Sequence, residues 1–173
     1  MEILNPKDHE EFMKIVWEEA KKAKCQKSHF GAIIVKEGIV LAKGHNKPID
    51  EVCEVCLRKE KNIGSGINSE LCFSVHAEQN ALLKALKDTK DISNAVMYIG
   101  HIKDGQIQKF SGKPYCTICS RLIAGSELKG VIFYTGDNYL FLTAKEFNEK
   151  SFETIIEKHN LKKSKNRLLF SFI

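Results

Sequence analysis

Two short motifs in this sequence carry residues that can bind a metal ion and move a proton. They are His76-Ala77-Glu78 and Cys116-Thr117-Ile118-Cys119, and each stands at the start of a predicted helix. The N–H groups and the dipole of a helix N-terminus favour a thiolate over a thiol. One imidazole and two thiolates fill three of the four tetrahedral positions of Zn²⁺, and the open position can hold water. We therefore expect a catalytic zinc ion bound by His76, Cys116 and Cys119.

Glu78 lies two residues after His76, a spacing that does not suit it as a ligand of the same metal. Its carboxylate can instead reach a water in the open position, which is the placement a general acid/base requires. Each motif alone has a plainer interpretation, since a lone Cys-x-x-Cys can be a redox pair or a structural knuckle. The two motifs together favour a catalytic zinc site with Glu78 as its proton carrier.

The elements that must position these motifs follow from the hydrophobic pattern. Helices are predicted over 8–24, 75–87, 117–124 and 145–159. Strands are predicted over 30–36, 39–44, 95–99, 131–134 and 167–173. Glu37-Gly38 and Asp104-Gly105 are typical of tight hairpin turns. This order predicts a mixed sheet covered by helices on both faces.

Length and charge narrow the class of protein. A chain of 173 residues with 43% hydrophobic composition predicts one domain over 1–173, with a long cysteine-containing loop at 46–72. The net charge is +5, but five of the 27 basic residues follow Glu157, so the remaining 22 balance the 22 acidic residues. The excess charge therefore lies in a basic C-terminal segment, 158–173. A uniformly basic nucleic-acid surface is excluded, and RNA binding by this segment is the less favoured alternative to a solvated face.

The beginning of the sequence, MEILNPKDHEEF, is polar and has no signal-peptide pattern. No apolar run approaches the ~18 residues that a membrane span needs. We expect a cytoplasmic protein with no membrane partner. In that reducing compartment the six cysteines are better explained as metal ligands or buried residues than as disulfides.

Four stretches together resemble the cytidine and deoxycytidylate deaminase superfamily, over residues ~8–150. They are Phe30-Gly31-Ala32-Ile33-Ile34-Val35, Gly44-His45-Asn46, His76-Ala77-Glu78-Gln79-Asn80-Ala81 and Cys116-x-x-Cys119. The His-Ala-Glu-x-Asn-Ala form looks most like the deoxycytidylate deaminase branch. The resemblance implies a three-layer α/β/α fold with a mixed, mostly five-stranded central sheet.

The same resemblance implies hydrolytic deamination of a cytosine nucleotide, dCMP to dUMP with release of ammonia. Glu78 would carry the protons, Asn46 would contact the sugar, and Ala77 would belong to the substrate site. Phe30 is a candidate for stacking on the base. Lys47 could meet a substrate phosphate or could be an exposed, solvated lysine. The resemblance also implies a homo-oligomer.

Two other functions stay open at this point. The same fold could act on another amine, such as a purine base, a base in RNA or a nucleoside antibiotic. The chain could also be a non-catalytic, zinc-stabilised binding module, although such a module has no need for Glu78.

Cys25, Cys53, Cys56 and Cys72 remain after the catalytic ligands are assigned. Cys53 and Cys56 form a second Cys-x-x-Cys inside the long loop. Some deoxycytidylate deaminases similarly carry a second, structural zinc near this region, and four thiolates would close such a site. His45 or His101 could replace one of the thiolates. The alternative is that Cys25 and Cys72 are small buried residues.

Overall fold

The computed structural model of the chain describes residues 1–49, 55–64, 67–88, 90–114 and 116–160. Its strands are β1 Glu2–Leu4, β2 His29–Lys36, β3 Ile39–His45, β4 Lys47–Pro48, β5 Ser74–Val75, β6 Val96–Lys103, β7 Gln106–Gln108, β8 Gly130–Tyr134 and β9 Tyr139–Thr143. Its helices are α1 Glu10–Lys21, α2 Leu57–Glu60, α3 Ala77–Lys87, α4 Thr117–Gly125 and α5 Ala144–Lys158, with short 3₁₀ turns at Pro6–Asp8 and Ser69–Leu71.

The central sheet is mixed, as the sequence predicted. Its order is β1-β9-β8-β6-β2-β3, with β7 added to β6, so the described residues form a sheet of seven strands. β6 and β8 pair in parallel, and the other pairings are antiparallel. The sheet is thus larger than the mostly five-stranded one expected, because short strands extend it at β1 and β7.

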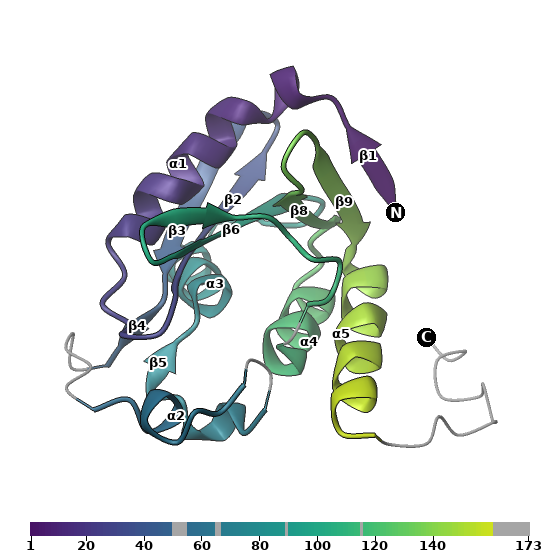
Figure 1. The fold of residues 1–173 in the computed structure, drawn as a ribbon. Helices are drawn as coiled ribbons and strands as arrows, with labels where there is room; N and C mark the ends of the chain where they lie inside the picture. Colours follow the sequence, from purple (N-terminus) through teal and green to yellow (C-terminus); the bar gives the residue numbers. More distant parts are fainter. Residues whose placement is uncertain (50–54, 65–66, 89, 115, 161–173) are drawn as a thin grey trace.

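Helices cover both faces of this sheet (Figure 1). α1 packs Met13 and Val16 against Ile33 and Tyr98 on one face. On the other face, α3, α4 and α5 close a larger core of buried apolar side chains from β2, β6, β8 and β9. Alternate residues of a strand point to opposite faces, which is why neighbouring residues of β2 contribute to both cores. The predicted three-layer α/β/α arrangement is therefore confirmed.

One hairpin of the sheet was predicted from the sequence, and another was missed. Asp104-Gly105 does turn β6 into β7, with positive φ at both residues. The sequence analysis missed β9, which pairs with β8 through the turn at 135–138. The strand predicted at 167–173 and most of the basic segment lie outside the described residues. Within the described ranges, no helix is long and apolar enough to cross a membrane.

Gly44 is the point where α3 lies directly on the sheet. A Cβ atom there would lie 2.4 Å from the carbonyl oxygen of Ala77 and 2.4 Å from the backbone nitrogen of Ala81. Both atoms belong to the helix backbone, which cannot yield by a side-chain rotation. Gly44 thus sets the distance between β3 and the helix that follows His76.

We expect Gly44→Ala to lower the free energy of unfolding by about 1–3 kcal/mol, because the added methyl group forces α3 away from β3. Urea denaturation measures this loss. Gly125→Ala is the control, since a Cβ atom at Gly125 meets nothing within 4 Å. A Gly44→Ala protein as stable as the Gly125→Ala protein would contradict this close packing.

Candidate functional site

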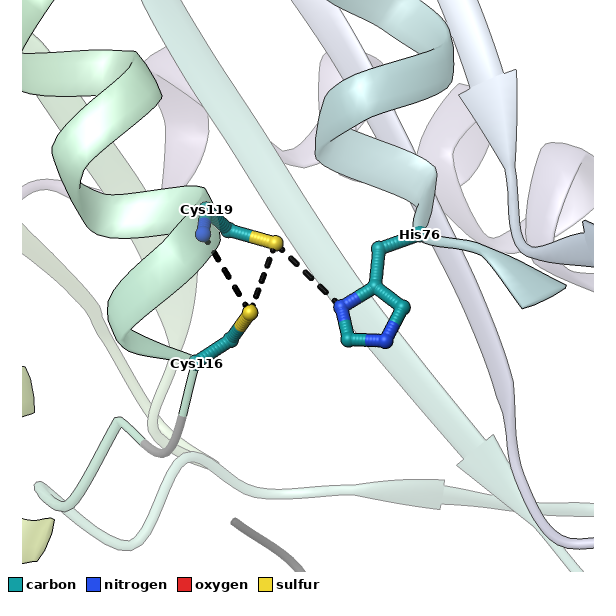
Figure 2. Close-up of side chains that lie close together, drawn as sticks. All are labelled: His76, Cys116 and Cys119. Atoms are coloured by element: carbon teal, nitrogen blue, oxygen red, sulfur yellow. Dashed lines mark hydrogen bonds between the residues drawn. The ribbon is translucent and has the colours of Figure 1, made fainter. Parts of the chain in front are cut away.

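Three side chains from two helix starts meet between α3 and α4 (Figure 2). The Nδ1 atom of His76 lies 3.2 Å from the Sγ atom of Cys119, and the two sulfur atoms of Cys116 and Cys119 lie 2.9 Å apart. All three ligand atoms lie within 4.8 Å of one another, the only such cluster in the described part of the chain. One imidazole nitrogen and two sulfurs suit zinc. The predicted ligand set is confirmed: zinc is bound by His76, Cys116 and Cys119.

Local hydrogen bonds orient both helix starts. Cys116 caps α4, and its sulfur accepts a hydrogen bond from the backbone N–H of Cys119 at 3.2 Å. At α3, the backbone N–H of His76 donates to Oε1 of Gln79 at 2.9 Å. Asn80 donates from Nδ2 to the carbonyl oxygen of His45 at 2.8 Å and so ties α3 to β3. The sequence analysis missed these positioning roles of Gln79 and Asn80, although a glutamine three residues after a helix cap is a recognisable signal.

The ligand side chains polarise one another. The hydrogen bond between the sulfurs lowers the pKa of Cys116 and, together with burial, raises that of Cys119. Burial acts to lower the pKa of His76, but hydrogen bonds with Cys116 and Cys72 raise it to about 11. The side chains alone therefore favour a thiolate beside an imidazolium. A divalent cation bound among them takes the place of the shared proton.

Glu78 lies in the first turn of α3, beside this cluster, and only 9% of the residue is exposed. Burial raises the pKa of its carboxyl, as does the nearby Cys116, while His76 and a hydrogen bond with Cys119 act in the opposite direction. A carboxyl with a raised pKa can both accept and release a proton near neutral pH. The structure thus places a buried carboxyl group with a raised pKa next to the metal ligands.

A cavity of about 240 Å³ opens beside the ligands. Phe30, Asn46 and Ala77, three of the predicted substrate contacts, line it. The fourth, Lys47, is not among the lining residues, and its backbone pairs with Val75 in the two-stranded β4–β5 sheet.

Phe30 and Asn46 are held firmly in the cavity wall. The Phe30 ring stacks on the imidazole of His101, with ring centroids 4.2 Å apart and the planes 4° from parallel. Asn46 accepts from the backbone N–H of Phe30 at 2.6 Å and donates to the carbonyl oxygen of Ser28 at 2.9 Å. The side-chain oxygen of Asn46 can accept one further hydrogen bond, and its NH₂ group can donate one more. The wall is therefore rigid and keeps polar capacity for a ligand.

Three of the four remaining cysteines belong to the lining of this cavity. Cys25, Cys56 and Cys72 all line it, and Cys72 also contacts the imidazole of His76. Within the described residues these three do not form a close ligand cluster, and Cys53 lies outside those residues. The second zinc site stays a prediction.

Four cations in the cavity wall were given no role by the sequence analysis. Lys27, Arg58, Lys109 and Lys113 line the same cavity but come from three separate segments of the chain. No periodic pattern predicts that they share one space, so only the fold brings them together.

Comparisons with known proteins agree on one type of chemistry. A sequence profile of the cytidine and deoxycytidylate deaminase zinc-binding region matches residues 6–135. The deoxycytidylate deaminase of Mycobacterium phage D29 is 30% identical over 131 residues, which cover 72% of this chain and 91% of that protein. The deoxycytidylate deaminase of Saccharomyces cerevisiae is 32% identical over 103 residues, covering 56% of this chain and 31% of the yeast protein.

A solved structure is similar to the whole deaminase-like region. The crystal structure of the dCMP deaminase from the cyanophage S-TIM5, in complex with dCMP and dUMP, aligns with a TM-score of 0.54 and 27% sequence identity. The alignment covers 74% of this chain and 81% of the cyanophage chain.

Proposed function

The chain belongs to the cytidine and deoxycytidylate deaminase family, and from this premise we propose that it converts dCMP to dUMP with release of ammonia. One observation carries the proposal: a buried Glu78 lies beside the zinc ligands His76, Cys116 and Cys119 at the wall of a cavity. Two further facts support dCMP as the substrate. The phage and yeast relatives are deoxycytidylate deaminases, and the cyanophage relative was crystallised with dCMP and dUMP.

The proposed reaction adds water to the amino-bearing carbon of the cytosine ring and expels ammonia. Bound zinc supplies a Lewis acid that lowers the pKa of water, so that hydroxide is available near neutral pH. The Glu78 carboxylate accepts one proton from the attacking water and delivers it to the ring nitrogen beside the carbon under attack. The carbon–oxygen bond forms as this proton moves.

Glu78 then serves a second time. It takes the remaining proton of the added hydroxyl and passes it to the amino group, and the carbon–nitrogen bond breaks as ammonia leaves. The two protons of water end on the ring nitrogen and on ammonia, and the oxygen remains as the carbonyl of uracil. The burial of Glu78 supports this role, because a raised pKa suits a group that must both accept and release protons.

The remaining contacts concern the base and the sugar. We propose that Phe30 and Ala77 border the base and that Asn46 binds the sugar. The rigid stack of Phe30 on His101 supports an aromatic surface against which a base can lie. The spare hydrogen-bonding capacity of Asn46 supports a sugar contact.

Two further proposals follow from the family. Exposed apolar side chains on α3 and α4, Leu83, Leu86, Ile118 and Leu122, support association with copies of the same chain. Cys25, Cys53, Cys56 and Cys72, or three of them with His45 or His101, remain the proposed ligands of a second, structural zinc.

A substrate panel tests the proposed function. Zinc-loaded protein is incubated separately with dCMP, CMP, deoxycytidine, cytidine, guanine and adenosine, and ammonia release is followed. We expect dCMP to have the highest kcat/KM, at least tenfold above that of deoxycytidine. Faster turnover of guanine or adenosine would replace dCMP with another amine. Release of ammonia from none of the cytosine compounds would overturn the proposal.

A further inference from the structure

We propose that Arg58 and Lys27 form the site that binds the phosphate group of the substrate, and that they make the enzyme prefer a nucleotide to a nucleoside. This inference rests on the proposed function, because it names residues that hold one end of the proposed substrate. It concerns the wall of the cavity formed by residues 25–28 and by the segment around α2.

Arg58 is a buried cation with unused hydrogen-bonding capacity. Only 9% of the residue is exposed, and Arg58 is one of the residues that line the cavity. Nη2 donates to the carbonyl oxygen of Gly64 at 2.9 Å, while Nε is buried without a hydrogen-bond partner. No carboxylate pairs with this guanidinium among the residues that the structure describes. Since an arginine always keeps its charge, burial without an anion is costly, and a bound anion would remove that cost.

Lys27 places a second positive charge beside the first. Its ammonium group donates to the carbonyl oxygen of Ile63, and Arg58 donates to that of Gly64. The two cations therefore meet at adjacent residues of the loop after α2, although Lys27 comes from the segment between α1 and β2 and Arg58 from α2 itself. Both also line the cavity. Two fixed cations facing one space are the arrangement that a phosphate group recognises.

The cavity wall as a whole has an excess of positively charged side chains. Its described cationic residues are Lys27, Arg58, Lys109 and Lys113, against a single carboxylate, Glu78. Lys113 is engaged with Glu157 by an ion pair of 2.9 Å. Ser28 and Ser69 add hydroxyl groups on the Arg58 side. Because residues 1–157 carry no net charge, this local excess is not a consequence of a basic protein.

Arg58 and Lys27 line the same cavity as the metal ligands, so one small molecule can contact both sets of residues. Cys72 hydrogen-bonds with the metal ligand His76 and lies within electrostatic range of Arg58, and all three residues line the cavity. A ligand in this cavity can therefore present its base to Glu78 and its phosphate to the cations.

Kinetics of Arg58→Gln with two substrates test the proposal. We expect kcat/KM for dCMP to fall at least tenfold, mostly through KM, while kcat/KM for deoxycytidine changes less than about twofold, because only dCMP carries the phosphate. Arg58→Lys keeps the charge but loses the Nε donor, and its loss should be smaller. Lys59→Gln removes an exposed neighbouring charge and serves as the matched control.

A measurement on the unmodified protein avoids any folding defect of the variant. Inorganic phosphate should compete with dCMP in the wild-type enzyme but leave deoxycytidine turnover unchanged. Calorimetry should likewise show that dUMP binds at least tenfold more tightly than deoxyuridine, and that Arg58→Gln removes this difference. Zinc content and melting temperature are measured on every variant.

The outcomes separate this inference from the proposed function. Equal losses for dCMP and deoxycytidine, or zinc loss in Arg58→Gln, would mean that Arg58 only supports the loop or a thiolate site, and would overturn the phosphate assignment. Failure of phosphate to compete in the wild-type enzyme would overturn it as well. A wild-type protein that binds dUMP through Arg58 but deaminates no cytosine compound would instead overturn the proposed function and leave the phosphate site standing.

Discussion

Glu78→Gln is expected to lower the rate of deamination at least a hundredfold while the protein keeps its zinc and its fold. The amide has nearly the same shape as the carboxyl group but cannot accept a proton from water or pass one to the substrate. General acid/base groups contribute about 10²–10⁴ to a rate, and Glu78 is proposed to act in both halves of the reaction. Ammonia release under saturating dCMP measures kcat directly.

The matched control for this change is Glu11→Gln. Glu11 also lies in the first turn of a helix, but it is exposed and far from the metal ligands in the sequence. The Glu11→Gln enzyme should be as active as the wild type. Zinc analysis and thermal melting accompany both variants, so that a loss of metal or fold is not mistaken for a loss of chemistry. A Glu78→Gln enzyme that keeps more than a few per cent of wild-type activity would remove Glu78 from the mechanism.

The second large effect is expected from Cys119→Ser. Cys119 is fully buried, and its sulfur lies between the sulfur of Cys116 and the imidazole of His76. Serine is a poor zinc ligand, so the variant should lose the catalytic zinc and at least a hundredfold in activity. It should also melt at a lower temperature, because a metal that binds only the folded state stabilises that state.

Chelation provides the control for this experiment. Wild-type protein treated with a strong chelator should lose activity and regain it when zinc is added, whereas Cys119→Ser should not recover. Metal analysis also tests the proposed structural zinc, since Cys119→Ser should lose one zinc per chain and keep any second one. A single zinc in fully occupied wild-type protein would reject the second site. Full zinc occupancy and near-normal activity in Cys119→Ser would contradict the assigned ligand set.

The metal ligands, and the place of Glu78 beside them, were predictable because they depend on local sequence. His76 and Glu78 are two residues apart, Cys116 and Cys119 are three apart, and each pair begins a helix. Residue types at such short spacings report directly which atoms can share one metal ion. The structure brings these two pairs together without altering either prediction.

Parts of the fold were less predictable. The amphipathic pattern of α3 and the turn residues of the hairpins are local signals, and they were read correctly. β9 was missed because its sequence, YLFLT, has no clear alternation of apolar and polar residues, although Gly136, Asp137 and Asn138 before it are turn residues. Its strand state depends on pairing with β8 and β1, which are contacts that no local window contains.

The sequence by itself determined the metal, its ligands and the layered fold, because each follows from residue type, short-range spacing and the order of the elements. Only the tertiary structure decided which charged groups line the cavity. The sequence left Lys47 open between a phosphate contact and a solvated lysine; it is not among the lining residues, whereas Lys27 and Arg58 are. The reason is physical: the direction of a side chain in an irregular loop depends on what packs around it, and those neighbours come from distant parts of the chain.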